Sequence, residues 1–301
     1  MEIHELSAFL AVAETGSFSQ AAEHLFLTQP AVSKRIAALE SRLGVRLFDR
    51  IGHRINLTEA GRQLRPRARD LLDEISDIHR SLSNLSGEVG GTLSMGTSHH
   101  IGLHRLPPIL RRFNRDYPQV RLDIRFLDSE AGCDAVESGE LELAVVTLPT
   151  TPSPKLQLRK IWPDPLVFMV ARDHPLAKEP HLTPERLTAY PALLPGSGTY
   201  TRNILEQALT PLGLKIEAAI STNYLETLRT MVTAGLGWSL LPHTMLDDRE
   251  IRALEIPNLK LARTLGLVTH GGRSLSNAAR AMIAICERSA EIRETSTTKE
   301  S

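Results

Sequence analysis

The stretch TQPAVSKR at 28–35 combines an amide, a hydroxyl and two cations within a short segment of a predicted helix. Gln29 can hydrogen-bond an adenine edge, and Ser33 and Lys34 can reach bases or phosphates. Arg35 lies at the flank of this group, where it can bind a phosphate. These side chains at this spacing predict the end of a helix that reads DNA in the major groove.

A second stretch, TSHHIGLH at 97–104, brings three histidines close together in the sequence. His100 and His104 are one helical turn apart and could share a metal ion, with His99 as a third nitrogen ligand. No acidic or cysteine ligand lies nearby in the sequence, so we expect neither a metal nor another cofactor. Ser98 beside His99 is not a hydrolase signature, because neighbours in sequence rarely reach the required geometry, and no G-x-S-x-G occurs. The missing catalytic constellation predicts that the chain is not an enzyme.

The helix that carries the first stretch has clear start signals. Thr28 is a suitable N-cap, and Pro30 falls in the first turn, where its missing N–H is harmless. Four apolar residues recur at steps of four, three and four along this helix, at Val32, Ile36, Leu39 and Leu43. This stripe predicts a buried face, so the polar end of the helix must face outward. A helix at 4–14 and a short helix beginning at Ser17 precede it, which predicts a helix-turn-helix.

Two short β segments, VRLFDR and INLT, follow this helix and predict a wing. His53 and Arg54 at the tip of the wing can touch the neighbouring minor groove. The chain from 28 to 69 contains ten basic and three acidic residues, although the net charge of the whole chain is zero. A basic excess confined to one region is typical of a phosphate-binding face, and it predicts double-stranded DNA as a partner.

A long helix is predicted from 58 to 86, and its apolar residues follow a heptad pattern. This pattern, called the seam below, comprises Leu57, Gly61, Leu64, Ala68, Leu71, Ile75, Ile78, Leu82 and Leu85. A narrow apolar seam between polar flanks needs a partner helix, so we expect the chain to form a dimer here. A dimer in turn suits a DNA site with two-fold symmetry.

The bulk composition limits the class of protein. A chain of 301 residues suits two or three domains, and a hydrophobic content of 42% is ordinary for a globular protein. Cys133 and Cys286 are far apart and outside any metal-ligand motif, so we expect buried thiols, with a redox switch as the alternative. No apolar run reaches the ~18 residues of a membrane span, and the N-terminus lacks a signal-peptide pattern. We therefore expect a cytoplasmic protein without a membrane partner.

The chain beyond residue 90 has a different pattern. Strand-like segments such as TLSMGT, VRLDIRFL and LELAVV alternate with amphipathic helical segments. This alternation predicts an α/β fold with a parallel sheet and covering helices.

The segment LSAFLAVAETGSFSQAAEHLFLTQPAVSKRIAALESRLGVRLFDR, followed by LTEAGRQL, resembles the LysR-type transcriptional regulators. The resemblance implies a winged helix-turn-helix, a linker helix, and a two-lobed effector domain like the periplasmic binding proteins. It also implies a homotetramer built as a dimer of dimers that binds dyad-symmetric promoter DNA and senses a small effector. A member that acts as an activator also contacts RNA polymerase. By this resemblance, Gln29, Pro30, Ser33 and Lys34 match recognition-helix positions, and Arg54 matches the wing.

The resemblance and the residue patterns together predict the domain boundaries. These are 1–57 for the winged helix-turn-helix, 58–89 for the linker helix, 90–161 with 266–292 for effector subdomain I, 162–265 for effector subdomain II, and 293–301 for a disordered tail.

The resemblance also implies an effector cleft between the two lobes. Polar residues that end predicted strands or begin predicted helices would line this cleft, because helix N-termini favour anions. These residues are Thr97, Ser98, His99, His100, Ser129, Thr147, Ser197, Thr199, Tyr200 and Asn223, with Arg202 as a fixed positive charge. Hydroxyls, amides and helix ends suit a small anion such as a carboxylate. Alternatively, the Ser and Thr residues only cap their helices.

Two other functions are compatible with parts of the sequence. A cytoplasmic solute-binding or enzymatic α/β protein with an N-terminal dimerisation module would share the second part of the chain. The missing secretion signal argues against a transport function, and the missing catalytic constellation argues against an enzyme. A DNA-architectural protein without a ligand is the third interpretation.

Overall fold

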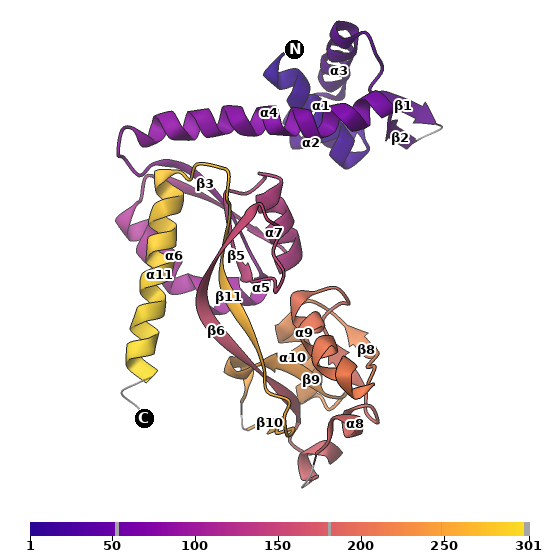
Figure 1. Ribbon diagram of the computed structural model, residues 1–301, viewed down its shortest axis with the longest axis vertical. Helices are drawn as coiled ribbons and strands as arrows, with labels where there is room; N and C mark the ends of the chain where they lie inside the picture. Colours follow the sequence, from indigo (N-terminus) through magenta and orange to yellow (C-terminus); the bar gives the residue numbers. More distant parts are fainter. Residues whose placement is uncertain (52–53, 180–181, 248, 298–301) are drawn as a thin grey trace. The chain divides into compact units, whose positions relative to one another are not determined.

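The computed structural model describes residues 1–51, 54–179, 182–247 and 249–297 (Figure 1). The chain divides into two compact units, Met1–Ser86 and Gly87–Ser301. Among the described residues, none of the helices combines the length and the apolarity needed to cross a lipid bilayer.

The first unit is a helical domain with a small hairpin. Its elements are α1 (Ile3–Thr15), α2 (Phe18–His24), α3 (Gln29–Leu43), β1 (Phe48–Ile51), β2 (Arg54–Leu57) and α4 (Glu59–Asn84). Antiparallel pairing of β1 with β2 forms the predicted wing. The Ser17 side chain caps α2 by accepting the N–H of Gln20 at 3.3 Å. The predicted helix-turn-helix is therefore confirmed, with a local reason for the start of its second helix.

The apolar stripe of α3 faces the core of this unit. Val32 and Leu39 are fully buried, and Ile36 is 3% exposed, within a cluster that includes Phe9 of α1. Leu43 was expected to continue the stripe, but it is 39% exposed. It belongs to the last turn, which ends where Gly44 takes a left-handed conformation. The stripe is thus one turn shorter than its sequence spacing predicts.

The seam divides into two halves with different surroundings. Gly61 and Ala68 are buried against the helix-turn-helix core, and a Cβ on Gly61 would lie 2.3 Å from the Leu47 carbonyl oxygen. From Leu71 onward the seam is open, and Ile78 is 50% exposed. The expectation that the whole seam awaits a partner helix is therefore wrong for its first half, which packs within its own unit.

The second unit is built on a seven-stranded sheet in the order β10-β6-β11-β5-β3-β4, with β9 paired to β6. Its strands are β3 (Gly91–Thr97), β4 (Val120–Phe126), β5 (Leu143–Thr147), β6 (Leu156–Ala171), β9 (Ser239–Pro242), β10 (Ile251–Leu254) and β11 (Leu261–His270). The predicted parallel pairing holds for β3 with β4 and β5, whereas β6 and β11 pair antiparallel. The sheet is therefore mixed, because two long strands run side by side through both lobes.

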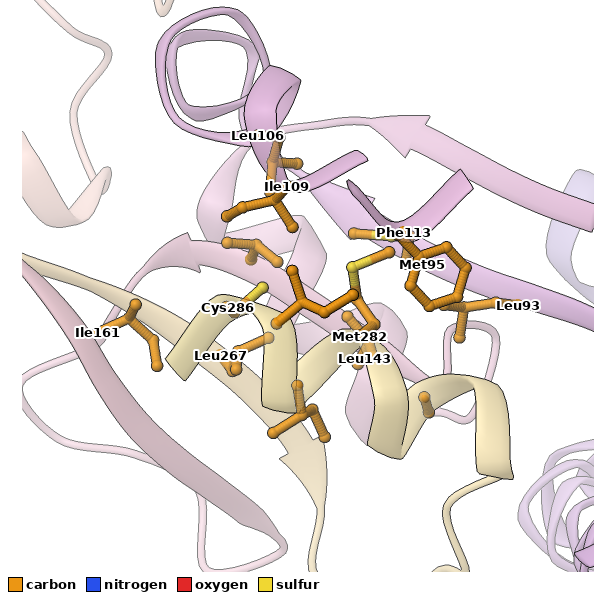
Figure 2. Close-up of a cluster of buried hydrophobic side chains, with 14 of the residues drawn as sticks. Leu93, Met95, Leu106, Ile109, Phe113, Leu143, Ile161, Leu267, Met282 and Cys286 are labelled. Atoms are coloured by element: carbon orange, nitrogen blue, oxygen red, sulfur yellow. The ribbon is translucent and has the colours of Figure 1, made fainter. Parts of the chain in front are cut away.

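Four helices belong to the first lobe: α5 (His99–His104), α6 (Leu106–Asp116), α7 (Ser129–Glu137) and α11 (Asn277–Thr297). Figure 2 shows Met282 and Cys286 of α11 in one buried cluster that also contains Phe113 and Met95. The backbone of α11 continues to Thr297, so residues 293–297, which were predicted to belong to a disordered tail, are helical. Residues 298–301 lie outside the described part.

The second lobe has its own buried clusters, which include Trp238, Phe168 and Leu228. Its further elements are η1 (Pro175–Lys178), α8 (Pro184–Leu187), β7 (Ala192–Leu194), α9 (Tyr200–Leu209), η2 (Thr210–Leu212), β8 (Ala218–Ser221), α10 (Leu225–Thr233) and η3 (His243–Met245). The register of β6 and β11 shifts between Leu265 and Gly266. A Cβ on Gly266 would lie 2.2 Å from the Arg159 carbonyl oxygen, so only glycine fits this crossing.

Candidate DNA interface and effector cleft

The N-terminal end of α3 presents polar side chains to solvent. Gln29 and Lys34 are exposed and Ser33 is half-buried, while the apolar stripe on the opposite side is buried. The Gln29 amide donates to the Ser33 hydroxyl at 3.0 Å, so the two side chains share one face, one helical turn apart. Gln29 and Lys34 on this face are open to solvent, as a DNA-reading helix requires.

The remaining predicted DNA contacts surround that face. Thr28 occupies the N-cap of α3, Pro30 is exposed in its first turn, and Arg35 is half-buried on its flank. Arg54 begins β2 at the end of the wing, and its side chain is outside the described part. His53 lies outside the described residues.

A cavity of about 50 Å³ lies in the second unit, where both lobes contribute residues. Four helix starts and two strands supply its lining, which comprises Ser98, His99, His100, Asp128, Ser129, Glu130, Thr147, Pro195, Thr199, Tyr200, Thr201, Asn223, Leu225 and Arg263. The starts of α5, α7, α9 and α10 converge here because parallel strands deliver their helices to the same edge. Helix N-termini carry partial positive charge, so the arrangement favours an anion.

Eight of the predicted effector residues line this cavity, and three do not. Thr97 is fully buried, and its hydroxyl donates to the Val145 carbonyl at 2.9 Å, which joins β3 to β5. Ser197 and Arg202 line a separate cavity of about 510 Å³ beside α9. The Arg202 guanidinium donates to Glu206 at 2.6 Å and to the Ile216 carbonyl, so it joins α9 to the segment before β8 within the second lobe.

The positive charge at the cavity is supplied by Arg263 of β11, which was absent from the predicted set. Its Nε donates to Asp164 at 2.7 Å and its Nη1 donates to Thr201 at 3.0 Å. Its Nη2 is buried and has no hydrogen-bond partner among the described residues. A single arginine in the mostly apolar segment LARTLGLVTH was the sequence signal for this residue.

Asp164 of β6 joins two guanidinium groups at the crossing between the lobes. It is fully buried and accepts from Arg263 and, at 3.3 Å, from Arg105. Two cations with one carboxylate leave a positive charge beneath the cavity. This charge and the free N–H of Arg263 are the features that an anion would meet there.

Two acidic side chains close the cleft from the first lobe. The Asp128 carboxylate accepts from the Asn223 amide at 2.6 Å. The Glu130 carboxylate accepts the backbone N–H of Tyr200, at the start of α9. Burial raises the pKa of the Glu130 carboxyl above its ordinary value. These contacts join the lobes on one side of the cavity.

Both cysteines are buried and free, as expected. Burial raises the pKa of the Cys133 thiol to about 11 and that of Cys286 to about 12. Both thiols are therefore protonated at neutral pH, which disfavours oxidation or metal binding.

The chain joins a basic helix-turn-helix to a two-lobed domain whose helix starts converge on a cavity that favours an anion. This combination defines the class of ligand-responsive DNA-binding regulators. Comparison with known families gives the particular family. The model for the "Bacterial regulatory helix-turn-helix protein, lysR family" matches residues 3–62, and the "LysR substrate binding domain" matches residues 86–291. The chain belongs to the LysR family of transcriptional regulators and is a DNA-binding regulator with an effector-binding domain.

The chain is similar to relatives over nearly its whole length. It is 32% identical over 289 residues to the "Uncharacterized HTH-type transcriptional regulator YeiE" of Escherichia coli (strain K12), covering 95% of this chain and 97% of that relative. A full-length OxyR variant from Pseudomonas aeruginosa shares the fold with a TM-score of 0.68 and 24% identity, covering 97% of this chain and 95% of that one. Full-length CbnR complexed with its target DNA gives a TM-score of 0.61 and 20% identity, covering 96% of this chain and 100% of that one.

Proposed function

We propose that the exposed N-terminal face of α3 reads base pairs in a dyad-symmetric promoter. The supporting observation is that Gln29 and Ser33 share one outward face above a buried stripe. Gln29 then pairs with an adenine edge, while Lys34 and Arg35 bind phosphates and fix the register. CbnR, which has this fold, has been solved in complex with its target DNA, and that structure supports the same use of the domain.

Binding to DNA selected from a random pool tests this assignment. The footprint should show two half-sites related by a dyad, and Gln29→Ala should weaken binding by about 1–3 kcal/mol at the optimal site. Gln63→Ala is the matched control, because Gln63 is an exposed amide of α4. Lys34→Ala should instead weaken binding to every sequence. It should also reduce by about one the steepness with which the logarithm of the binding constant falls with the logarithm of the salt concentration. If Gln29→Ala and Ser33→Ala both bind like the wild type, α3 does not read the bases through this face.

We propose further that the effector is a small anion bound between the lobes. The observation that carries this proposal is the buried Nη2 of Arg263, which lacks a partner among the described residues and belongs to the cavity lining. A carboxylate or a similar oxyanion would accept this N–H together with groups at the converging helix starts. His99 and Ser129 line the same cavity from the first lobe.

The size of the cavity favours a small effector. Its volume of about 50 Å³ exceeds the ~10–15 Å³ that one water needs. A small anion therefore suits it better than a large one.

Thermal unfolding with a panel of small anions tests this part. Both tryptophans, Trp162 and Trp238, are buried in the second unit, so their fluorescence follows that unit alone. An anion at ~100 times its dissociation constant should add about 2.7 kcal/mol of stability. Arg263→Lys should reduce this gain, whereas Arg202→Lys, in the neighbouring cavity, should keep it. If no anion stabilises the wild type, or if both variants respond alike, the assignment of Arg263 is wrong.

The open half of the seam supports an oligomer. Leu71, Ile78, Leu82 and Leu85 are 44–82% exposed along one helix, and such a stripe is stable when paired with a second copy. We propose a dimer through α4 and a homotetramer built as a dimer of dimers. In this assembly the protein acts in the cytoplasm without catalysis, and it contacts RNA polymerase where it activates.

A further inference from the structure

Three side chains meet at the boundary between the lobes, beside the effector cavity. His100 and His104 belong to α5 of the first lobe, and Glu226 belongs to α10 of the second. The Nδ1 atom of His100 lies 2.9 Å from Oε1 of Glu226, and Nε2 of His104 lies 3.0 Å from the same oxygen. The two imidazole rings are 4.6 Å apart. The acidic ligand that the sequence around the histidines lacks is thus supplied from 122 residues further along the chain.

The potential ligand atoms of this cluster lie close together. Those of His100, His104 and Glu226 are all within 4.8 Å of one another. The ion-pair partners of the Glu226 carboxylate in the described part of the chain are these two histidines. One ion could therefore contact all three side chains at once.

The second oxygen of the carboxylate also lacks a partner. Oε2 of Glu226 is buried and has no hydrogen-bond partner among the described residues. A carboxylate with one shared oxygen and one free oxygen can bind a metal through either or both.

We propose that His100, His104 and Glu226 bind one divalent transition-metal ion that joins the two lobes, with Zn²⁺ as the reference ion. Two imidazoles and one carboxylate are a common ligand set for Zn²⁺ with an open fourth position. Two histidines at i and i+4 on one helical face are suited to hold such an ion. The present N···O separations of 2.9 and 3.0 Å must widen to about 3.4 Å, the edge of a tetrahedron with bonds of about 2.1 Å. A shift of a few tenths of an ångström in side-chain position provides this.

The position of the site gives the ion a structural consequence. Because the histidines and Glu226 come from different lobes, the ion cross-links α5 to α10 and stabilises the closed cleft. His100 also lines the effector cavity, so the ion lies beside the anion site and adds positive charge there. The metal site is independent of the identity of the effector, since its ligands and its test require neither DNA nor an anion.

Titration of the metal-free, full-length protein with Zn²⁺ tests the proposal. Isothermal titration calorimetry should show one high-affinity ion per chain, and Co²⁺ in its place should give the intense visible absorption of a tetrahedral site. Zn²⁺ should raise the unfolding temperature that the two tryptophans report. Mg²⁺ and Ca²⁺ should have no such effect, because they prefer all-oxygen ligand sets.

Two variants locate the site in both lobes. His104→Ala removes a half-exposed ligand, and Glu226→Gln keeps the shape of the carboxyl without its charge. Each should weaken Zn²⁺ binding by at least about tenfold and abolish the Zn²⁺-dependent rise in unfolding temperature. His243→Ala, an exposed histidine of η3 in the second lobe, is the matched control and should bind Zn²⁺ like the wild type.

Three outcomes would overturn the proposal. One is a wild-type protein that binds no Zn²⁺ in this titration. Another is undiminished binding by His104→Ala and Glu226→Gln, which would place the metal elsewhere. The last is a cluster that stabilises the protein only when acid protonates its histidines, with no response to any metal. Circular dichroism of each variant confirms that a lost signal reflects the site and not the fold.

Discussion

The buried pairing of Asp164 with two arginines allows a quantitative prediction about the second unit. Asp164 has no exposed surface, and its partners Arg105 and Arg263 are at most 9% exposed. Asp164→Asn keeps the volume of the side chain but removes its charge. Two guanidinium groups are then left close together in a buried position without a counter-ion.

The magnitude follows from the burial of the pair. Breaking a buried ion pair by removing one partner destabilises a protein by about 3–5 kcal/mol. In a unit of this size, each kcal/mol lowers the unfolding temperature by about 2–4 °C, so we expect a fall of about 6–20 °C. An exposed pair should behave differently, because solvent screens it and its contribution is about 0–1 kcal/mol.

Urea unfolding followed by tryptophan fluorescence measures this effect, since both tryptophans are in the second unit. The denaturant midpoint should fall at an unchanged slope, which shows a change in stability and not in the unfolded state. Glu287→Gln is the control, because Glu287 pairs with Arg159 at 2.8 Å while both side chains are exposed. If Asp164→Asn and Glu287→Gln unfold at similar urea concentrations, the buried network does not stabilise the crossing of the lobes.

Three further predictions concern the dimer seam, the thiols and one carboxyl. Ile78→Glu, on the open half of the seam, should convert the oligomer to folded monomers in light scattering; an unchanged mass would contradict this. Because burial raises the pKa of Cys133 to about 11 and of Cys286 to about 12, thiol reagents at pH 8 should modify neither until urea unfolds the chain. Burial raises the pKa of Glu130 in the folded protein above 4.5. Its stabilising contribution is therefore complete below pH 4.5 and is lost as the pH rises through the pKa of the folded state. Glu130→Gln should therefore lose less stability than the wild type over that rise, and parallel pH profiles would refute the assignment.

The first unit could be predicted almost entirely from the sequence, because its signals are local. Ser17 and Gly44 mark the start and the end of helices through contacts within a few residues. The 3.6-residue period of the α3 stripe placed Gln29 and Ser33 on the outer face. The error at Leu43 arose because the spacing of apolar residues alone cannot show where the neighbouring helices stop covering α3.

The second unit was predicted less completely because its decisive contacts are long-range. The strand and helix order indicated the α/β class, but the antiparallel pairing of β6 with β11 depends on strands about a hundred residues apart. Arg202 was chosen for the cleft as a fixed positive charge, yet its side chain turns toward Glu206 within its own lobe. Arg263 and Glu226 reach their sites from distant segments, so no local pattern could have paired either with its partners.

The position of Glu130 bears on how an anion could change the state of this regulator. Its carboxylate accepts the N–H of Tyr200 at the start of α9, the type of place where helix N-termini bind anions. An anion that contacts this N–H must therefore displace Glu130. The net affinity of the anion is then the free energy of its own interaction with the N–H minus that of the Glu130 interaction it replaces. To change the ratio of the closed cleft to another arrangement tenfold, the anion must bind one of the two states more tightly by about 1.4 kcal/mol. The free N–H of Arg263 can supply such a difference, because Glu130 does not use it and an incoming anion would.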